Sequence, residues 1–240
     1  MCLCKGLEET RKSGKGYLMA NILHLETATK VCSVALSSNG KLIALKETQE
    51  DGYSHGENLT LFIEDLLKSA NLSMKDLNAV SIASGPGSYT GLRIGVSTAK
   101  GLCYALGIPM IAIDALTSLC EIAREKHSDQ NLCAMIDARR MEVYSIIQDK
   151  DGNVLKEISA DILDETSYAE FQPFIFFGDG AAKMDSVWSG ESKIIDASIS
   201  SSATGQIRLA YEAFQKEKFE DIAYFEPFYL KDFVVGKKTK

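Results

Sequence analysis

The sequence lacks any segment that would carry the chain into or across a membrane. No apolar run is long enough to span a bilayer. Residues 1–18 contain four basic residues but no apolar stretch of signal-peptide length, which excludes an ordinary secretory signal. We therefore expect a cytoplasmic protein with no membrane partner. Residues 1–18 are expected to be a disordered N-terminal extension, or to precede a native start at Met19.

Motifs for covalent and metal chemistry are also missing. The six cysteines form no Cys-x-x-Cys pair, and most lie in apolar runs, as small core residues do in a reducing compartment. There is no Gly-x-Ser-x-Gly elbow and no convincing Cys/His nucleophile pair. The sequence therefore predicts no catalytic residue and no metal site, and it leaves a peptidase activity without a mechanism.

Two common phosphate-binding motifs fail at the glycine-rich residues 85–91. A P-loop would need lysine directly after Gly91, where the chain has Leu92. A dinucleotide-binding fingerprint would need glycine in place of Thr90, and it would follow the first strand of the fold. Neither motif describes this stretch.

Positive charge is scarce in the body of the chain. The formal net charge is −7, but residues 1–18 carry +2 and residues 231–240 carry +3, so the body between them carries −12. A nucleic-acid-binding surface has to neutralise phosphates with basic side chains. We expect any contact with RNA to be made through a partner or by the basic tail, residues 231–240.

The most informative stretch that is present reads as strand, tight turn and helix. Residues 79–83 form a short apolar, β-branched run, a Gly-Pro-Gly turn follows, and Ser88 is placed to cap a helix. Gly107 and Pro109 are expected to end that helix.

Three glycines lie inside this predicted helix, although each costs about 1 kcal/mol relative to alanine. Gly91, Gly95 and either Thr98 or Ala99 fall on one face, where a second backbone can approach closely. Two explanations remain open: close packing on the chain's own sheet, or a docking face for the helices of another protein.

The remaining pattern predicts two similar α/β halves. The first half combines a meander, an amphipathic helix with a Ser54-x-x-Glu57 capping box and two further strands, with strands at residues 21–26, 31–37, 41–48, 79–83 and 110–113. The order then restarts with strands at residues 132–136, 142–148, 153–159 and 174–177, before a final amphipathic helix at residues 203–218. We interpret this as a degenerate duplication and predict a two-lobed α/β protein with mixed sheets.

The segment Gly-Pro-Gly-Ser-Tyr-Thr-Gly-Leu-Arg-Ile-Gly, residues 85–95, closely resembles the signature of the TsaB (YeaZ) family. These proteins are the dimerisation subunits of the bacterial tRNA threonylcarbamoyladenosine machinery. The resemblance extends over nearly the whole chain, to Leu25-Glu26-Thr27, Ser54-His55-Gly56-Glu57, residues 137–144 and Tyr229-Leu230-Lys231.

The resemblance implies the fold of the actin, sugar-kinase and Hsp70 (ASKHA) superfamily, with two tandem ribonuclease H-like lobes. The first lobe is expected to comprise residues 19–115 together with a C-terminal helix at about residues 203–225. The second lobe is expected to comprise residues 116–202, and residues 231–240 form a basic tail.

The resemblance also implies a non-catalytic subunit that binds and activates a TsaD-like threonylcarbamoyltransferase acting on the adenosine beside the tRNA anticodon. A TsaE-like ATPase would join the complex, tRNA would bind only through it, and the chain alone could form a homodimer. The expected partner interface lies on helices 54–70 and 88–106 and comprises His55, Glu57, Gly91, Arg93, Gly95, Thr98 and Leu102.

A nucleotide site is the remaining expectation. ATP-binding relatives carry Asp and small hydroxyl residues in the first hairpin, where this chain has Glu26-Thr27-Ala28, two departures that weaken a phosphate loop. Candidate residues are Glu26, Thr27, Asp137 and Arg139, for ATP or ADP at an interface shared with the partner and none in the isolated chain. The alternatives are a strand-capping Glu26 and an Asp137 paired within its own turn.

The chain departs from catalytic members of the same superfamily at their metal site. Catalytic relatives carry His-x-x-x-His on the first helix, whereas this chain follows His55 with Leu59, so no metal is expected. Two alternative functions remain open, an ATP-dependent phosphotransferase of the same superfamily and a self-associating interaction protein.

Overall fold

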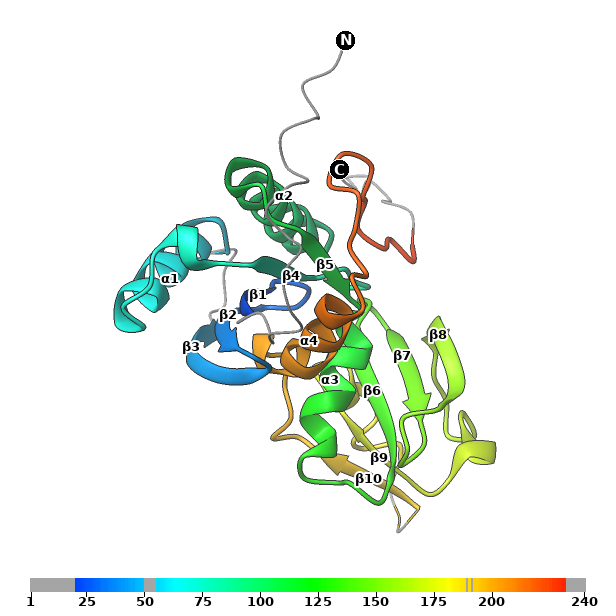
Figure 1. Ribbon diagram of the computed structural model, residues 1–240. Coiled ribbons are helices and arrows are strands. Elements are labelled where there is room, and N and C mark those ends of the chain that lie inside the picture. The colour runs from blue at the N-terminus through cyan, green and yellow to red at the C-terminus, as the bar shows by residue number, and fades with distance from the viewer. Residues whose placement is uncertain (1–19, 50–54, 189, 191, 232–240) are drawn as a thin grey trace, which may run out of the picture.

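The structure is a computed structural model that describes residues 20–49, 55–188, 190 and 192–231 (Figure 1). The predicted extension at residues 1–18, Met19, Ser54 and the tail beyond Lys231 lie outside the described residues. The first half of the chain contains β1 (Asn21–Glu26), β2 (Val31–Ser38), β3 (Lys41–Gln49), α1 (His55–Ser69), β4 (Ala79–Ala83), α2 (Tyr89–Leu106) and β5 (Met110–Ile113).

The second half repeats the strands but not the helices. It contains α3 (Ala115–Arg124), β6 (Asn131–Asp137), β7 (Glu142–Gln148), β8 (Val154–Ile162), β9 (Phe174–Phe177), β10 (Lys193–Asp196) and α4 (Ile207–Gln215). Short 3₁₀ turns at Ala169–Phe171 and Ala181–Lys183 stand where the first half has α1 and α2. A further 3₁₀ turn, Ala203–Gln206, leads into α4, so the final helix predicted at residues 203–218 is α-helical only over its middle part.

The two sheets have the same strand order, which confirms the predicted two-lobed α/β fold. The first sheet runs β3-β2-β1-β4-β5 and the second runs β8-β7-β6-β9-β10. In each sheet the first three strands form an antiparallel meander, and the last two pair in parallel. The predicted strands all form, whereas α3 and β10 were not predicted.

Helices cover both faces of the first sheet (Figure 1). Apolar side chains of α1 and α2 pack on one face against alternate residues of β1, β2 and β4, including Leu23, Leu25 and Val34. On the other face α4 packs through Ala210 against Ile22 and Ile111. This is the division expected for strands whose side chains alternate between two buried faces.

The two lobes share one core. Helix α3 packs on the second sheet, and the cluster around it also includes Ala28, Ala83 and Leu92 from the first lobe. The opposite face of the second sheet carries an aromatic cluster in which Trp188 lies 5.3 Å from the Phe176 ring and 5.7 Å from the Phe174 ring. No helix in the described residues is long and apolar enough to cross a membrane.

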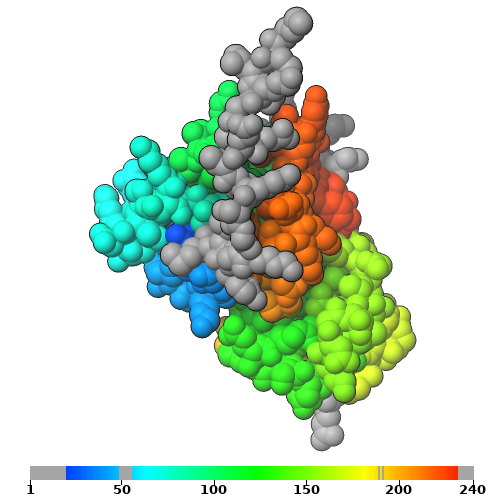
Figure 2. All heavy atoms as spheres, viewed as in Figure 1, coloured from blue at the N-terminus to red at the C-terminus, as the bar shows by residue number. Residues whose placement is uncertain are grey.

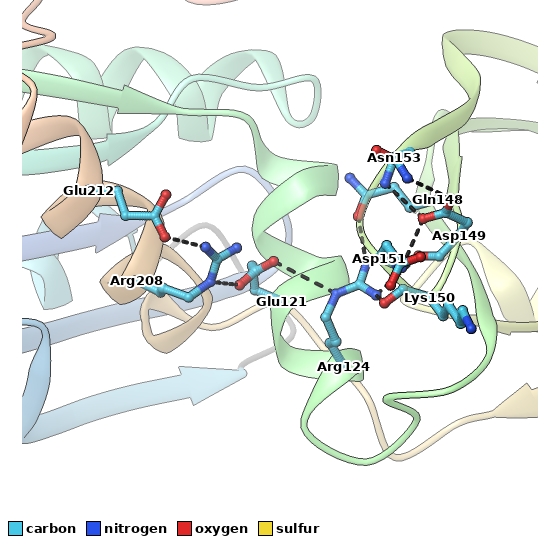
Figure 3. A network of polar contacts seen from close by, with 9 residues as sticks. All are labelled: Glu121, Arg124, Gln148, Asp149, Lys150, Asp151, Asn153, Arg208 and Glu212. Atoms are coloured by element: carbon cyan, nitrogen blue, oxygen red, sulfur yellow. Dashed lines mark hydrogen bonds and ion pairs between the residues drawn. The ribbon is translucent and has the colours of Figure 1, made fainter.

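A chain of polar contacts also links the lobes (Figure 3). Arg208 on α4 donates from Nε to Glu121 Oε2 on α3 at 2.6 Å and pairs with Glu212 on its own helix. Glu121 Oε1 lies 4.0 Å from Arg124 Nε, and Arg124 donates to Gln148 Oε1 at 3.0 Å and to the Lys150 carbonyl at 2.7 Å. The contacts run from the first lobe, through α3, to the β7–β8 turn.

Candidate functional site

The turn before α2 is held by hydrogen bonds and close packing within the chain. Ser88 caps the helix, with its Oγ accepting from the Gly91 amide at 3.3 Å. The Ser88 amide donates to the Ala28 carbonyl at 2.6 Å, and a Cβ on Gly87 would stand 2.2 Å from the same oxygen. The β1–β2 turn therefore occupies the helix N-terminus, a position where an anion would otherwise be favoured.

The glycine face of α2 packs on this chain rather than facing a partner. Gly91 and Gly95 are buried, and a Cβ on Gly91 would stand 2.1 Å from the Thr27 carbonyl oxygen. A Cβ on Gly95 would stand 2.3 Å from Thr27 Oγ1 and 2.9 Å from Ile82 Cδ1. The first of the two explanations is therefore correct for these glycines. Their inclusion in the partner interface was wrong, because the first lobe already fills that face.

Thr27 and Glu26 are both buried. Thr27 Oγ1 donates to the Gly91 carbonyl at 2.8 Å, and Glu26 Oε1 accepts from the Ala28 amide at 2.8 Å. Glu26 is only 1% exposed and Thr27 is 0% exposed. Neither side chain can reach a nucleotide without a rearrangement of the turn, so these two residues of the predicted nucleotide site serve the fold as it stands.

Burial leaves Glu26 in an unusual electrostatic environment. The pKa of Glu26 is raised to about 7, mainly by the loss of hydration; hydrogen bonds from the Ala28 amide and Gln206 oppose the shift, and the nearby Asp114 carboxylate adds to it. Asp114 caps α3 by accepting from the Thr117 amide at 2.7 Å, and burial raises the pKa of Asp114 to about 6. Glu26 is the last residue of β1, and Asp114 directly precedes α3.

Asp137 and Arg139 lie far more openly, at the β6–β7 turn. Asp137 accepts from the Arg139 amide at 2.6 Å and pairs with Lys183 at 2.6 Å. Arg139 and Arg140 are exposed and have φ values of 68° and 53°. This left-handed conformation costs an ordinary residue about 1–2 kcal/mol. Of the four residues of the predicted nucleotide site, Asp137 and Arg139 are therefore exposed, whereas Glu26 and Thr27 are buried.

The C-terminal segment, residues 228–231, contacts both lobes. The Phe228 amide donates to the Ser84 carbonyl at 2.8 Å, and Lys231 contacts the Ala138 carbonyl and pairs with Glu142 of the second lobe. Tyr229 and Leu230 pack on the shared core. Figure 2 shows the C-terminal part of the chain, in orange and red, between the surfaces of the first and second halves.

Arg93 contacts Tyr89 on its own helix and Tyr229 in the C-terminal segment. Its guanidinium lies 4.0 Å from the centre of the Tyr89 ring, and its Nε donates to Tyr229 Oη at 3.4 Å. The Tyr89 and Tyr229 ring centres are 4.9 Å apart. A cavity of about 280 Å³ lies beside them, lined by Arg93, Val96, Ser97, Lys100, Phe225, Glu226, Pro227 and Tyr229.

The other predicted interface residues lie on α1 and α2. Glu57 is exposed, whereas Thr98 and Leu102 are half-buried and Thr98 Oγ1 donates to the Ile94 carbonyl at 2.9 Å. His55 begins α1, and its side chain lies outside the described part of the structure.

Two exposed apolar residues on these helices were missed. Leu61 on α1 is 57% exposed and Tyr104 on α2 is 82% exposed. Leu61 does not belong to the apolar repeat of α1, and this departure from the repeat could have predicted its exposure. Within the described residues no group of three metal-ligating side chains comes together.

The comparisons with known proteins agree with this architecture. A family model described as "TsaD: tRNA N6-adenosine threonylcarbamoyltransferase" matches residues 50–237. The chain is 28% identical to a Haemophilus influenzae protein and 29% identical to an Escherichia coli protein, each named "tRNA threonylcarbamoyladenosine biosynthesis protein TsaB". These alignments cover 90% of this chain and 96% and 97% of the relatives. The chain belongs to the TsaD family, in its TsaB (YeaZ) group.

Solved structures of the family extend the agreement to the fold. Two structures from Pseudomonas aeruginosa, described as YeaZ and as similar to the peptidase YeaZ, superpose with TM-scores of 0.74 and 0.75 at 26% and 25% identity. They match 88% and 89% of this chain and 100% of their own chains. The family resemblance drawn from residues 85–95 is thereby confirmed.

Proposed function

We propose that this chain is a non-catalytic cytoplasmic subunit that binds and activates a TsaD-like enzyme in N6-threonylcarbamoyladenosine modification of tRNA. Family membership supports the pathway, since its relatives are named for threonylcarbamoyladenosine biosynthesis. A TsaE-like ATPase completes the complex in this proposal, and tRNA is its substrate. ATP or ADP binds at the shared interface rather than to the isolated chain.

The observation that carries the partner role is the exposure of two large side chains, Leu61 on α1 and Tyr104 on α2. Large side chains exposed on two adjacent helices are suited to contact the helices of another protein. Leu61 and Tyr104 are exposed on two helices that contact each other. An aromatic residue such as Tyr104 is also the kind of side chain that contributes strongly to interfaces.

The test is reconstituted threonylcarbamoyl transfer with the cognate TsaD-like and TsaE-like proteins. Transfer should require this chain, while the chain alone should neither transfer the group nor hydrolyse ATP. Replacing Leu61→Glu together with Tyr104→Glu should remove pairing, measured by size-exclusion chromatography with light scattering, and should remove transfer.

The matched control is Ile162→Glu on β8, where the residue replaced is 74% exposed on the second lobe. This variant should pair and support transfer normally. Full transfer without the chain would overturn the proposed function, and ATP turnover by the chain alone would favour the phosphotransferase instead. A stable homodimer that no partner displaces would favour a self-associating protein.

A further inference from the structure

Helix α2 is a positively charged element in an acidic protein. Its 18 residues contain Arg93 and Lys100 and no acidic residue, whereas the body of the chain carries −12. Among the described residues, neither cation forms an ion pair with a carboxylate. The two positive charges are therefore available to an anion from outside the chain.

Arg93 and Lys100 belong to one row of side chains along the helix. With Ser97 and Tyr104 they follow the spacing i, i+4, i+7 and i+11, which places all four residues on one side of α2. Arg93, Ser97 and Tyr104 are exposed, and Lys100 is half-buried. The row extends over about 16 Å, because each helical residue adds about 1.5 Å. It is long enough for a helix of another protein to pack along it.

A groove lies beside this row, between α2 and the chain that leads to Tyr229 (Figure 1). Both cations line it on the α2 side, and the other side is formed by Phe225, Glu226, Pro227 and Tyr229. Two cations against one acid leave the lining with a net positive charge. Its volume of about 280 Å³ is below the roughly 300–1,000 Å³ of sites that enclose a whole small molecule. The groove therefore suits a single acidic side chain.

Two contacts position Arg93 for such an anion. Its guanidinium lies 4.0 Å from the centre of the Tyr89 ring, and its Nε donates to Tyr229 Oη at 3.4 Å. The donors on its two terminal nitrogens have no partner among the described residues. A side chain that is positioned in advance loses less conformational freedom on binding, and a guanidinium can hold a carboxylate by two parallel hydrogen bonds.

The adjacent helix α1 carries the opposite charge. Its exposed row has the same spacing and comprises Glu57, Leu61, Glu64 and Lys68, which gives the row a net negative charge. Helices α1 and α2 pack on the same face of the first sheet, so both exposed rows point away from it on the same side. An acidic helix of a partner is attracted to α2 and repelled by α1, which favours one orientation of the partner.

We infer that α2 docks an acidic helix of the TsaD-like partner, with a Glu or Asp side chain of that helix in the groove beside Arg93 and Lys100. The inference rests on the proposed function, which pairs the partner with α1 and α2, and it adds the chemistry by which α2 recognises the partner. The exposed ring of Tyr104 continues the same row and offers an apolar contact to the same helix.

The test measures pairing of the full chain with its cognate TsaD-like protein by isothermal titration calorimetry in nucleotide-free buffer, at about 50 and about 300 mM salt. Arg93→Gln with Lys100→Gln should weaken pairing about tenfold at low salt and less at high salt, because exposed ion pairs are individually weak and are screened.

Lys100 gives the cleaner single variant, because it makes no hydrogen bond or ion pair among the described residues. Lys100→Gln should weaken pairing about threefold with an unchanged melting temperature. Lys100→Arg keeps the charge and should pair normally.

The matched control, Lys75→Gln with Lys150→Gln, removes the same charge at two other exposed positions and should pair like the unaltered chain. Equal loss in this control, or normal pairing of the variant lacking both Arg93 and Lys100, would overturn the inference alone. A difference that appears only when ATP is added would also overturn it, in favour of a nucleotide phosphate in the groove. Failure of the unaltered chain to pair at all would overturn the proposed function, and the inference with it.

Discussion

The side chain of Thr27 fills the space that a Cβ on Gly95 would need, with Thr27 Oγ1 only 2.3 Å from that position. Thr27 is fixed there by its hydrogen bond to the Gly91 carbonyl and by complete burial. The glycines of α2 thus allow the helix to press against the β1–β2 turn. The cost of glycine in a helix is offset by packing within the first lobe.

Replacing Gly95→Ala should therefore destabilise the fold itself. The added methyl group clashes with Thr27 and Ile82, and overpacking of this kind costs about 1–3 kcal/mol of unfolding free energy. The matched control is Gly101→Ala in the same helix, where a Cβ would meet nothing within 4 Å. That substitution should raise stability by about 0.5–1 kcal/mol. Urea unfolding followed by circular dichroism measures both, and equal effects would contradict the packing argument.

The buried Glu26 should make stability fall as pH rises. Its pKa is raised from 4.5 to about 7, so the folded state holds a proton that the unfolded state has already released between those values. Stability from this group is greatest below about pH 4.5 and is lost as pH rises through 7, by an amount on the order of 3 kcal/mol. Asp114, with a pKa raised to about 6, should act in the same direction.

The variant Glu26→Gln isolates this effect. Glutamine keeps an oxygen that can accept from the Ala28 amide but carries no titrating group. Its melting temperature should exceed that of the unaltered chain at pH 8, and the difference should shrink toward pH 5. A difference that is constant from pH 5 to pH 8 would show that Glu26 does not titrate in this window.

Much of the fold could be predicted from local sequence, but the residues that pack against each helix face could not. The Asn39-Gly40 turn, the Ser88 cap and the Gly107 end of α2 were all predicted, because each depends on a few adjacent residues. The glycine face was also visible in the helical spacing. Its neighbour is Thr27, more than sixty residues away, and that contact exists only once β1 and α2 are assembled.

The two elements that were not predicted from the sequence, α3 and β10, were missed for different reasons. Helix α3 had a local signal, since Asp114 caps it and the apolar residues Leu116, Leu119, Cys120 and Ala123 recur at helical spacing. Strand β10 is four residues long and pairs only with β9 at the sheet edge, so its conformation depends on that pairing. Leu61 and Tyr104 were missed for a similar reason, because their exposure is a property of the packed helices.

Glu121 should contribute more to stability than the other acid in its network. Its side chain is 14% exposed and lies between Arg208 and Arg124, whereas Glu212 is 46% exposed at the outer end (Figure 3). Removing the partly buried carboxylate of Glu121 leaves Arg208 with only the exposed Glu212 as an anionic partner, and it leaves Arg124 with neutral oxygens alone. Glu121→Ala should cost about 2 kcal/mol of unfolding free energy, and Glu212→Ala should change it by less than about 0.5 kcal/mol. Thermal unfolding of the two variants checks the difference, and equal losses would contradict a central role for Glu121.

The C-terminal segment should loosen when Tyr229 is removed. Tyr229 packs against the Tyr89 ring, contacts Arg93 and covers the shared core, so Tyr229→Ala loses a ring contact and apolar burial worth about 1–2 kcal/mol. The exposed Tyr224, at 84%, supplies the matched control, and Tyr224→Ala should be nearly neutral.

Hydrogen exchange gives a local readout, because the Phe228 amide is bonded to the Ser84 carbonyl. That amide should exchange faster in Tyr229→Ala while amides of β1 and β4 keep their protection. Unchanged exchange at Phe228 would mean that the segment is held by Lys231 and Phe228 without help from the tyrosine ring.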